Sequence, residues 1–207
     1  MQELKQRVAE RLAERGFEVY CTGGAEETKR QLLALIQPGQ SVGIGGSMTI
    51  RELGVIDELV ANGHVLYGHW GAKTPEEGEA IREQARGADV YLASANAVTA
   101  DGRIVNIDGM GNRVASMMFG PKTVILPVGI QKLVEGGLEA AIARIRTVAC
   151  PANAKRLKLP TPCGLTGKCN MRECSNDDAM CRVITILEHP TRGKRVVVLL
   201  SDEELGF

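Results

Sequence analysis

The sequence has few aromatic residues and no net charge. Aromatic side chains make up 3% of the 207 residues, which leaves little surface on which nucleic-acid bases could stack. The 25 basic and 25 acidic residues balance, so the chain lacks the excess of Lys and Arg that binding a polyphosphate backbone requires. These two features argue against nucleic acid as a partner.

The chain also lacks the uninterrupted apolar run of a signal peptide or a membrane span. Its first residues, MQELKQRVAERLAERG, mix charged and apolar side chains as an amphipathic helix does. We therefore expect no membrane partner and a cytoplasmic location. In that reducing compartment, six cysteines are more typical of a metal or redox site than of a disulfide framework.

Short apolar runs alternate with helical patterns along most of the chain. The runs are rich in Val, Ile and Leu, as expected for strands covered on both faces, and they lie at 41–45, 64–67, 89–93, 123–128 and 195–200. Helical patterns lie between them, notably at 75–86 and 138–146. This alternation predicts an α/β fold with a largely parallel sheet covered by helices. Segment 98–105 breaks the alternation and predicts a hairpin that turns at Asp101-Gly102.

One segment differs in composition from the rest. Residues 150–182 are rich in Pro, Asn, Cys and small residues and show no sustained periodicity. The strand-like run after them is expected to return to the main sheet. We therefore predict a cysteine-rich insertion within a single domain that spans 1–207. A homodimer is the default assembly for a small α/β protein.

A glycine-rich loop follows the predicted strand at 41–45. Its sequence, Gly43-Ile44-Gly45-Gly46-Ser47-Met48-Thr49, precedes a helical run, where backbone N–H groups and a helix N-terminus can hold an anion. Thr49 and Glu52 have the spacing of a capping box, which would fix the start of that helix. The alternative is a tight turn that binds no ligand. The loop has neither the dinucleotide fingerprint nor the Gly-Lys-Ser/Thr ending of a phosphate loop.

A second loop has the same placement. Asn106-Ile107-Asp108-Gly109-Met110-Gly111-Asn112-Arg113 follows a predicted strand and precedes a helical run at 114–119. Two such loops at the ends of neighbouring strands would face one crevice. Because the helix dipole disfavours a cation at a helix start, we expect Arg113 to hold an anion; a salt bridge to Asp108 is the alternative. The two loops together predict a site for a small anionic metabolite.

Asp108 and Glu52 flank this predicted crevice and are the candidates for catalysis. Either carboxyl could act as a general acid or base if burial or a like charge shifted its pKa toward neutrality. The alternative is that each caps a helix or pairs with an arginine. The spacing of the three histidines predicts neither a metal pair nor a nucleophile with its base.

Four segments resemble the LUD (lactate utilisation) domain family: GGSMTIRELG, SANAVTADGRIVNIDGMGNRVASMMFGPKTVILPVG, RIRTVACPANAKRL and LSDEELGF. They occur in order and cover most of the chain. The resemblance implies a fold like that of ribose-5-phosphate isomerase, glucosamine-phosphate deaminase and the CoA-transferases, in which a glycine loop binds a phosphate or acyl substrate. It also adds Asn96 to the expected ligand contacts. The chain departs from the family pattern around Asn96 and before Lys132, but both of these residues are in place.

Four cysteines lie close together in the predicted insertion. Cys163, Cys169, Cys174 and Cys181 could ligate either a zinc ion or an iron–sulfur cluster. The cluster is our first choice, because a lactate-oxidising system must move electrons and zinc has no redox chemistry. Unligated or partly disulfide-bonded thiols are the alternative. Cys150 is a spare ligand, whereas Cys21 is expected to be a small buried hydrophobe.

Three functions are compatible with these features. The first is a component of lactate or other hydroxy-acid oxidation, which binds an anionic metabolite at the two loops and passes electrons through the cysteines to partner proteins. The second is an isomerase or CoA-transferase-type enzyme that acts on a phosphorylated or acyl substrate. The third is a non-catalytic regulator that binds a metabolite. The family segments and the cysteines favour the first.

Overall fold

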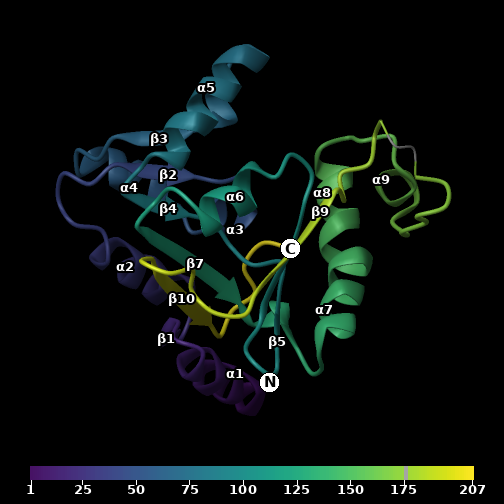
Figure 1. Ribbon diagram of the computed structural model, residues 1–207, viewed down its shortest axis with the longest axis horizontal. Helices are drawn as coiled ribbons and strands as arrows, with labels where there is room; N and C mark the ends of the chain where they lie inside the picture. The colour runs from purple at the N-terminus through teal and green to yellow at the C-terminus, as the bar shows by residue number, and fades with distance from the viewer. Residues whose placement is uncertain (175–176) are drawn as a thin grey trace.

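The fold is built around one parallel sheet. The computed structural model describes residues 1–174 and 177–207. Six strands pair in the order β1-β10-β7-β4-β2-β3, and every pairing is parallel. These strands are β1 (Glu18–Thr22), β2 (Val42–Ile44), β3 (Leu66–Gly68), β4 (Val90–Leu92), β7 (Thr123–Gly129) and β10 (Arg195–Ser201). The predicted α/β fold with a largely parallel sheet is therefore confirmed (Figure 1).

Helices cover both faces of this sheet. The α-helices are α1 (Gln2–Glu14), α2 (Ala25–Ala34), α3 (Met48–Glu52), α4 (Val55–Ala61), α5 (Pro75–Arg86), α6 (Asn112–Met118), α7 (Leu138–Arg144), α8 (Cys150–Arg156) and α9 (Pro162–Thr166). Single turns of 3-10 helix lie at His69–Gly71 and Ile130–Lys132, and a π-helix lies at Ile145–Ala149. Among the described residues, no helix is both long enough and apolar enough to cross a membrane.

Side chains along the central strand β7 point alternately to the two faces of the sheet, and they belong to two separate parts of the core. Val124, Leu126 and Val128 pack on one face with side chains of α1. Ile125 packs on the other face with side chains of α2 and α4. All four side chains are fully buried, and burying a side chain of this size contributes about 1.5–3 kcal/mol. Burial on both faces explains why the parallel strands appear in the sequence as continuous apolar runs.

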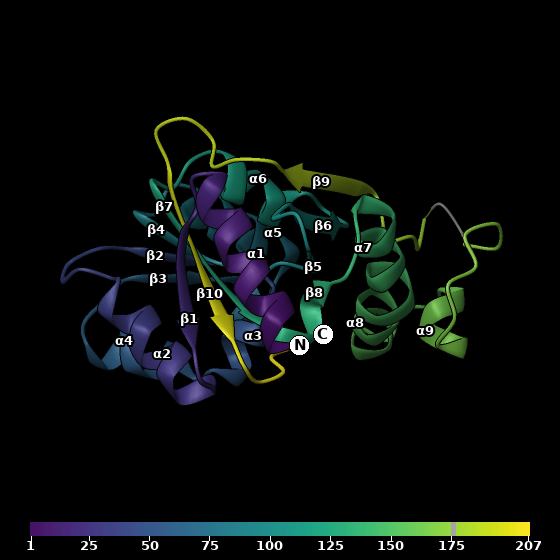
Figure 2. The ribbon, with the colours of Figure 1, turned by 90° about the horizontal axis from the view of Figure 1, so that it is seen from below.

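A second sheet stands beside the first, with strands in the order β8 (Leu133–Val134), β5 (Ala97–Thr99), β6 (Ile104–Asp108) and β9 (Val183–Leu187). β5 and β6 form the predicted hairpin. Gly102 in its turn has a φ of +81°, and a Cβ there would lie 2.7 Å from the backbone of Arg11, so the turn requires glycine. Figure 2 shows β5, β6 and β9 between the parallel sheet and the helices α7 to α9.

The cysteine-rich segment begins later than the predicted 150–182. The π-helix joins α7 to α8 in one helical run, so Cys150 lies within a helix. Pro151 is the second residue after the π-helix, and the widened turn that precedes it accommodates a residue without an N–H donor. The end of the segment leads into the unpredicted strand β9, which pairs with β6. Residues 175–176, within the predicted insertion, lie outside the described residues.

Candidate functional site

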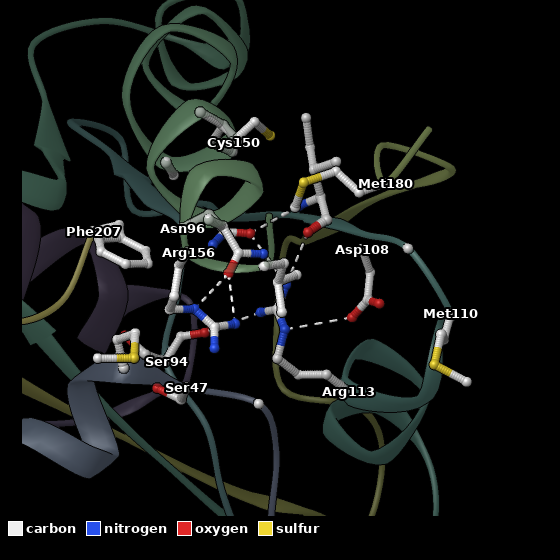
Figure 3. A pocket seen from close by; sticks show the side chains of 18 of the residues that line it. Ser47, Ser94, Asn96, Asp108, Met110, Arg113, Cys150, Arg156, Met180 and Phe207 are labelled. Atoms are coloured by element: carbon white, nitrogen blue, oxygen red, sulfur yellow. Dashed lines mark hydrogen bonds and ion pairs between the residues drawn. The ribbon is translucent and has the colours of Figure 1, made fainter. Parts of the chain in front are cut away.

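A pocket of about 600 Å³ opens where the parallel strands end (Figure 3). The segments that follow five of these strands each contribute a residue to its lining: Ser47, His69, Ser94, Lys132 and Phe207. The second sheet contributes the end of β6, and α8 contributes Cys150, Asn153 and Arg156. The carboxyl ends of parallel strands share one edge of a sheet, which is why these distant segments meet here.

The structure brings most of the predicted ligand residues to this pocket. The lining includes Gly46, Ser47, Thr49, Asn96, Asp108, Gly109, Asn112 and Arg113. The two predicted loops therefore face one pocket, although they follow strands of two different sheets rather than neighbouring strands of one. Within the described part of the chain, the pocket lining does not include the predicted residues Gly43, Gly45, Asn106, Gly111 and Glu52.

Two of the predicted glycines are explained by packing. A Cβ at Gly43 would lie 2.3 Å from the carbonyl oxygen of Ala85, so this glycine lets β2 approach α5. A Cβ at Gly45 would lie 2.9 Å from the hydroxyl of Tyr91. Gly46 differs, because the nearest atom to its Cβ position, 3.8 Å away, belongs to His69 across the pocket. Close packing, against the backbone of Ala85 and the side chain of Tyr91, therefore explains the first two.

The predicted capping box is wrong. Ser47 caps α3, with its side chain accepting a hydrogen bond from the N–H of Ile50 at 3.3 Å. The Thr49 hydroxyl instead donates to the carbonyl of Leu205 at 3.1 Å. Glu52 accepts from the N–H of Gly206 at 2.6 Å. Both side chains therefore hold the segment that follows β10.

Arg113 is fully engaged inside the protein. Its two terminal nitrogens donate four hydrogen bonds, to the carbonyls of Ser94 and Ile107 and to the amide oxygens of Asn96 and Asn106. Its Nε lies 3.4 Å from Oδ2 of Asp108, and Figure 3 shows this ion pair. Arg113 thus makes the salt bridge to Asp108 that was the alternative to holding an anion.

Asp108 has the contacts of a structural carboxylate. Its Oδ1 accepts from the N–H of Gly111 at 2.9 Å and so closes the loop. Its Oδ2 is buried and, within the described residues, has no hydrogen bond, although it faces Arg113. The side-chain nitrogen of Asn106 is also buried without a hydrogen bond in this part of the chain. The carboxylate therefore has an arginine partner, as the alternative to catalysis predicted.

Lys132 is a residue of the pocket lining that the sequence did not place in the site. Its side chain is almost completely buried in the pocket wall. The Nζ donates to the hydroxyls of Thr49 at 2.7 Å and Ser94 at 3.1 Å. Burial, together with the nearby guanidinium groups of Arg144 and Arg113, lowers the pKa of Lys132 to about 7. Its position soon after a buried parallel strand was the signal that could have identified it.

Apolar and cationic side chains complete the pocket. Trp70 and Phe207 line it, and the guanidinium of Arg51 lies 5.2 Å from the centre of the Trp70 ring. Arg156, on α8, donates to the amide oxygen of Asn153 at 2.8 Å and is exposed to solvent. The lining thus combines an aromatic surface with cations at different depths.

Five thiols meet in a second, smaller pocket of about 50 Å³. Its lining includes Cys150, Cys163, Cys169, Cys174 and Cys181, called here the cysteine cluster. The sulfurs of Cys150 and Cys181 lie 3.3 Å apart. Within the described residues, no three or more His, Cys, Asp or Glu side chains are arranged to hold one metal ion. The four predicted ligands therefore share one pocket, with Cys150 as a fifth.

Cys21 lies apart from the cysteine cluster. It is on β1, the edge strand of the parallel sheet, and its side chain is exposed. The expectation of a small buried hydrophobe is wrong at this position because an edge strand leaves part of its surface uncovered. Burial of part of the side chain nevertheless raises the pKa of the Cys21 thiol.

The two pockets share a wall. Ile107, Cys150 and Met180 line both of them. Cys150 belongs to α8, Ile107 to β6, and Met180 to the segment that leads into β9. Cys150, a member of the cysteine cluster, therefore also lies in the wall of the larger pocket.

Comparison with known proteins gives a family and a fold. The LUD domain profile matches residues 5–200. The crystal structure of a DUF162 family protein from Deinococcus radiodurans has 15% sequence identity, covers 97% of each chain and has a TM-score of 0.56, which shows a shared fold. Ribose 5-phosphate isomerase A from Methanocaldococcus jannaschii has 18% identity, covers 53% of each chain and has a TM-score of 0.34. None of the curated proteins matches the chain.

Proposed function

Because the chain belongs to the LUD (lactate utilisation) domain family, we propose that it is a component of lactate or other hydroxy-acid utilisation. It binds a small anionic metabolite in the larger pocket and passes electrons to partner proteins through the cysteine cluster. The observation that carries this proposal is the wall of Ile107, Cys150 and Met180 that both pockets share. A ligand in one pocket and a redox centre in the other would be neighbours.

The larger pocket has the chemistry for an anion. Its volume of about 600 Å³ falls within the usual range for small-molecule sites. Lys132 supplies a buried cation, and the hydroxyls of Ser47, Thr49 and Ser94 are also in the lining. A hydroxy acid offers a carboxylate and a hydroxyl, which pair with such groups. The volume also leaves room for acids larger than lactate.

The cysteine cluster fits an iron–sulfur centre better than a single zinc ion. Zinc needs its ligands around one point, at about 2.3 Å from the metal, and the described residues offer no such group of three. An iron–sulfur cluster binds thiolates that are spread around several iron atoms, as thiols lining a common pocket could be. When bound, such a centre supplies electron transfer. Cys163, Cys169, Cys174 and Cys181 remain the expected ligands, with Cys150 in reserve.

The acid–base alternative has less support. Glu52 accepts a hydrogen bond from Gly206 and stands outside the pocket lining. Asp108 is held by Gly111 and Arg113. Each candidate acid or base already has a structural partner, so an isomerase or CoA-transferase-type reaction would have to rely on other groups.

The test is the iron, acid-labile sulfide and zinc content of protein purified without oxygen, together with its visible absorption spectrum. We expect iron and sulfide in comparable amounts and absorption in the visible range. Cys163→Ser, which changes a buried member of the cysteine cluster, should lose most of both. Cys21→Ser, at the exposed cysteine on β1, is the matched control and should keep them. Zinc alone, or no metal in the wild type, would contradict the electron-transfer part of the proposal.

A further inference from the structure

Lys132 has a buried amino group without a carboxylate partner. The residue is 3% exposed, and in the described part of the chain no carboxylate oxygen lies within 4.0 Å of its Nζ. The other buried lysine, Lys5, differs, because its Nζ lies 2.5 Å from Oδ1 of Asp202. An ammonium group taken out of water without a negative partner is unfavourable. The surroundings of Lys132 therefore favour the arrival of a negative charge.

Lys132 also has a hydrogen-bond donor to spare. An ammonium group has three N–H donors, and two of them go to the hydroxyls of Thr49 and Ser94. Arg113, the other cation deep in the lining, donates four hydrogen bonds to the protein and pairs with Asp108 through its Nε. Of these two cations, Lys132 is the one that can bind a ligand directly.

We propose that Lys132 binds the carboxylate of the metabolite, and that the Ser47 hydroxyl, also in the pocket lining, donates a second hydrogen bond to it. This inference rests on the proposed function and names its ligand class, a monoanionic carboxylic acid. One uncompensated buried charge is balanced by one negative charge on the ligand. A phosphate dianion would leave one of its two negative charges without a buried cation, because Arg113 is already paired with Asp108.

The electrostatics give this proposal a measurable signature. Burial and the guanidinium groups of Arg144 and Arg113 lower the pKa of Lys132 to about 7, whereas Glu52 acts in the opposite direction. At pH 8 the free protein therefore holds Lys132 mostly as the neutral amine. A bound carboxylate favours the ammonium form and raises this pKa again, so binding takes up a proton. The carboxylate affinity falls as the pH rises above about 7.

The experiment is isothermal calorimetry at pH 8 with L-lactate, pyruvate and inorganic phosphate, each in two buffers that differ in ionisation enthalpy. We expect wild-type protein to bind the carboxylates and to take up between roughly half a proton and one proton. Lys132→Met should lower the affinity at least about tenfold and remove the proton uptake. Lys122→Met is the matched control, because this exposed lysine lies just before the opposite end of β7, and it should change neither.

Folding of the Lys132→Met variant is checked by thermal unfolding. The hydroxyls of Thr49 and Ser94 keep their own acceptors, the carbonyls of Leu205 and Pro127, so we expect a folded variant. The proton uptake of wild-type protein tests the proposal without any variant.

Three outcomes would count against the proposal in different ways. Carboxylate binding without proton uptake, and with equal affinity in Lys132→Met, overturns the role of Lys132 and leaves the proposed function standing. Tighter binding of phosphate than of either acid overturns the carboxylate class. Absence of binding of all three probes by wild-type protein overturns the ligand pocket of the proposed function, and this inference with it.

Discussion

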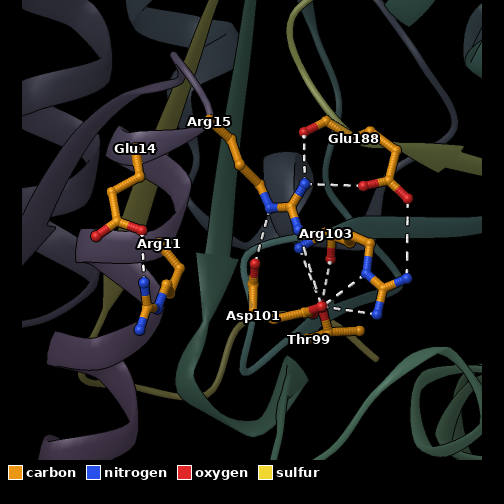
Figure 4. A network of polar contacts seen from close by, with 7 residues as sticks. All are labelled: Arg11, Glu14, Arg15, Thr99, Asp101, Arg103 and Glu188. Atoms are coloured by element: carbon orange, nitrogen blue, oxygen red, sulfur yellow. Dashed lines mark hydrogen bonds and ion pairs between the residues drawn. The ribbon is translucent and has the colours of Figure 1, made fainter.

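Arginines at the junction of α1 and the second sheet each meet two carboxylates, whereas the lysine in the pocket wall meets none. Arg15 and Arg103 both pair with Asp101 and with Glu188, in the network of Figure 4. Lys132 has two hydroxyl partners, and no carboxylate oxygen in the described residues lies within 4.0 Å of its Nζ. In the first region the charges balance one another and fasten the hairpin to its neighbours. In the second, the amino group of Lys132 has no carboxylate partner among the described residues.

Burial decides how much each charged contact contributes. The carboxylates at the junction are half-exposed, with 45% of the Asp101 and 52% of the Glu188 side chain accessible, so water screens their ion pairs. In the pocket wall, Arg113 and Asp108 are 11% and 9% exposed. Contacts there are stronger, and a group left without a partner is correspondingly costly. Changes in the pocket wall should therefore have larger effects than changes at the junction.

Arg113→Met is expected to have the largest effect. It leaves the buried carboxylate of Asp108 and the amide oxygens of Asn96 and Asn106 without their shared donor. Removing one partner of a buried pair typically costs about 3–5 kcal/mol of the free energy of unfolding. Urea denaturation of wild type and variant measures it, with Arg11→Met, on the exposed face of α1, as a control that should leave the midpoint unchanged. A loss below about 1 kcal/mol would contradict a structural role for Arg113.

Lys5→Met is expected to have an intermediate effect. The variant removes the donor to Asp202 and to the carbonyl of Thr22, but Asp202 keeps access to water, so the loss is about 1 kcal/mol at pH 7. Hydrogen bonds from Lys5 and Gln2 lower the pKa of Asp202 in the folded protein. The ionised Asp202 carboxylate therefore stabilises the folded protein above the pKa that this group has in the unfolded chain, about 4. This stabilisation is lost as the pH falls through the lower pKa of Asp202 in the folded protein.

The check for Lys5→Met is urea denaturation at pH 7 and at pH 3. We expect the difference between wild type and variant to narrow at the lower pH, because Asp202 is then increasingly protonated in both proteins. A difference that stays the same at both values would show that the Asp202 charge does not contribute to it.

Glu188→Gln is expected to have the smallest effect. Arg15 and Arg103 keep Asp101 as a partner, and the Glu188 side chain is 52% exposed. The free energy of unfolding should fall by no more than about 0.5 kcal/mol, and added salt should reduce the difference further. Thermal unfolding at low and high ionic strength tests this. A loss greater than about 1 kcal/mol would show that ion pairs at the junction contribute more to the free energy of unfolding than exposed pairs do, as expected only for the pocket wall.

The sequence predicted the parallel sheet well because its signals are local. Each buried strand is a short apolar run, and the hairpin is marked by Asp101-Gly102. The course of the chain after residue 144 was predicted less well. Cys150 and Pro151 suggested a loop, yet the helix continues through them. β9 was missed although its sequence, Val183-Ile184-Thr185-Ile186-Leu187, is a β-branched run of the kind that indicates a strand; it pairs with β6.

The sequence indicated where the candidate site lies but not which partners its charged residues have. Glycine loops are local features, so the two loops could be found and expected to face one pocket. The roles of Arg113 and Lys132 depend on partners that are far apart in the sequence. Lys132 meets a hydroxyl 83 residues away, and Arg113 meets a carbonyl 19 residues away. Nothing in the neighbouring residues indicates which cation is satisfied by the protein itself.

The length of the helical run that contains the π-helix, between α7 and α8, is a feature by which relatives of this chain can be compared. Each residue turns a helix by about 100°, and a π-turn holds one residue more than the α-helical turn it replaces. The residue count between Gly137 and Pro151 therefore sets which side chain reaches the wall shared by the two pockets, here Cys150. A relative with one residue fewer would present another side chain at that point. Aligned sequences could thus be sorted, by this length and by the residue at the position of Cys150, into proteins that join the two pockets through a thiol and proteins that do not.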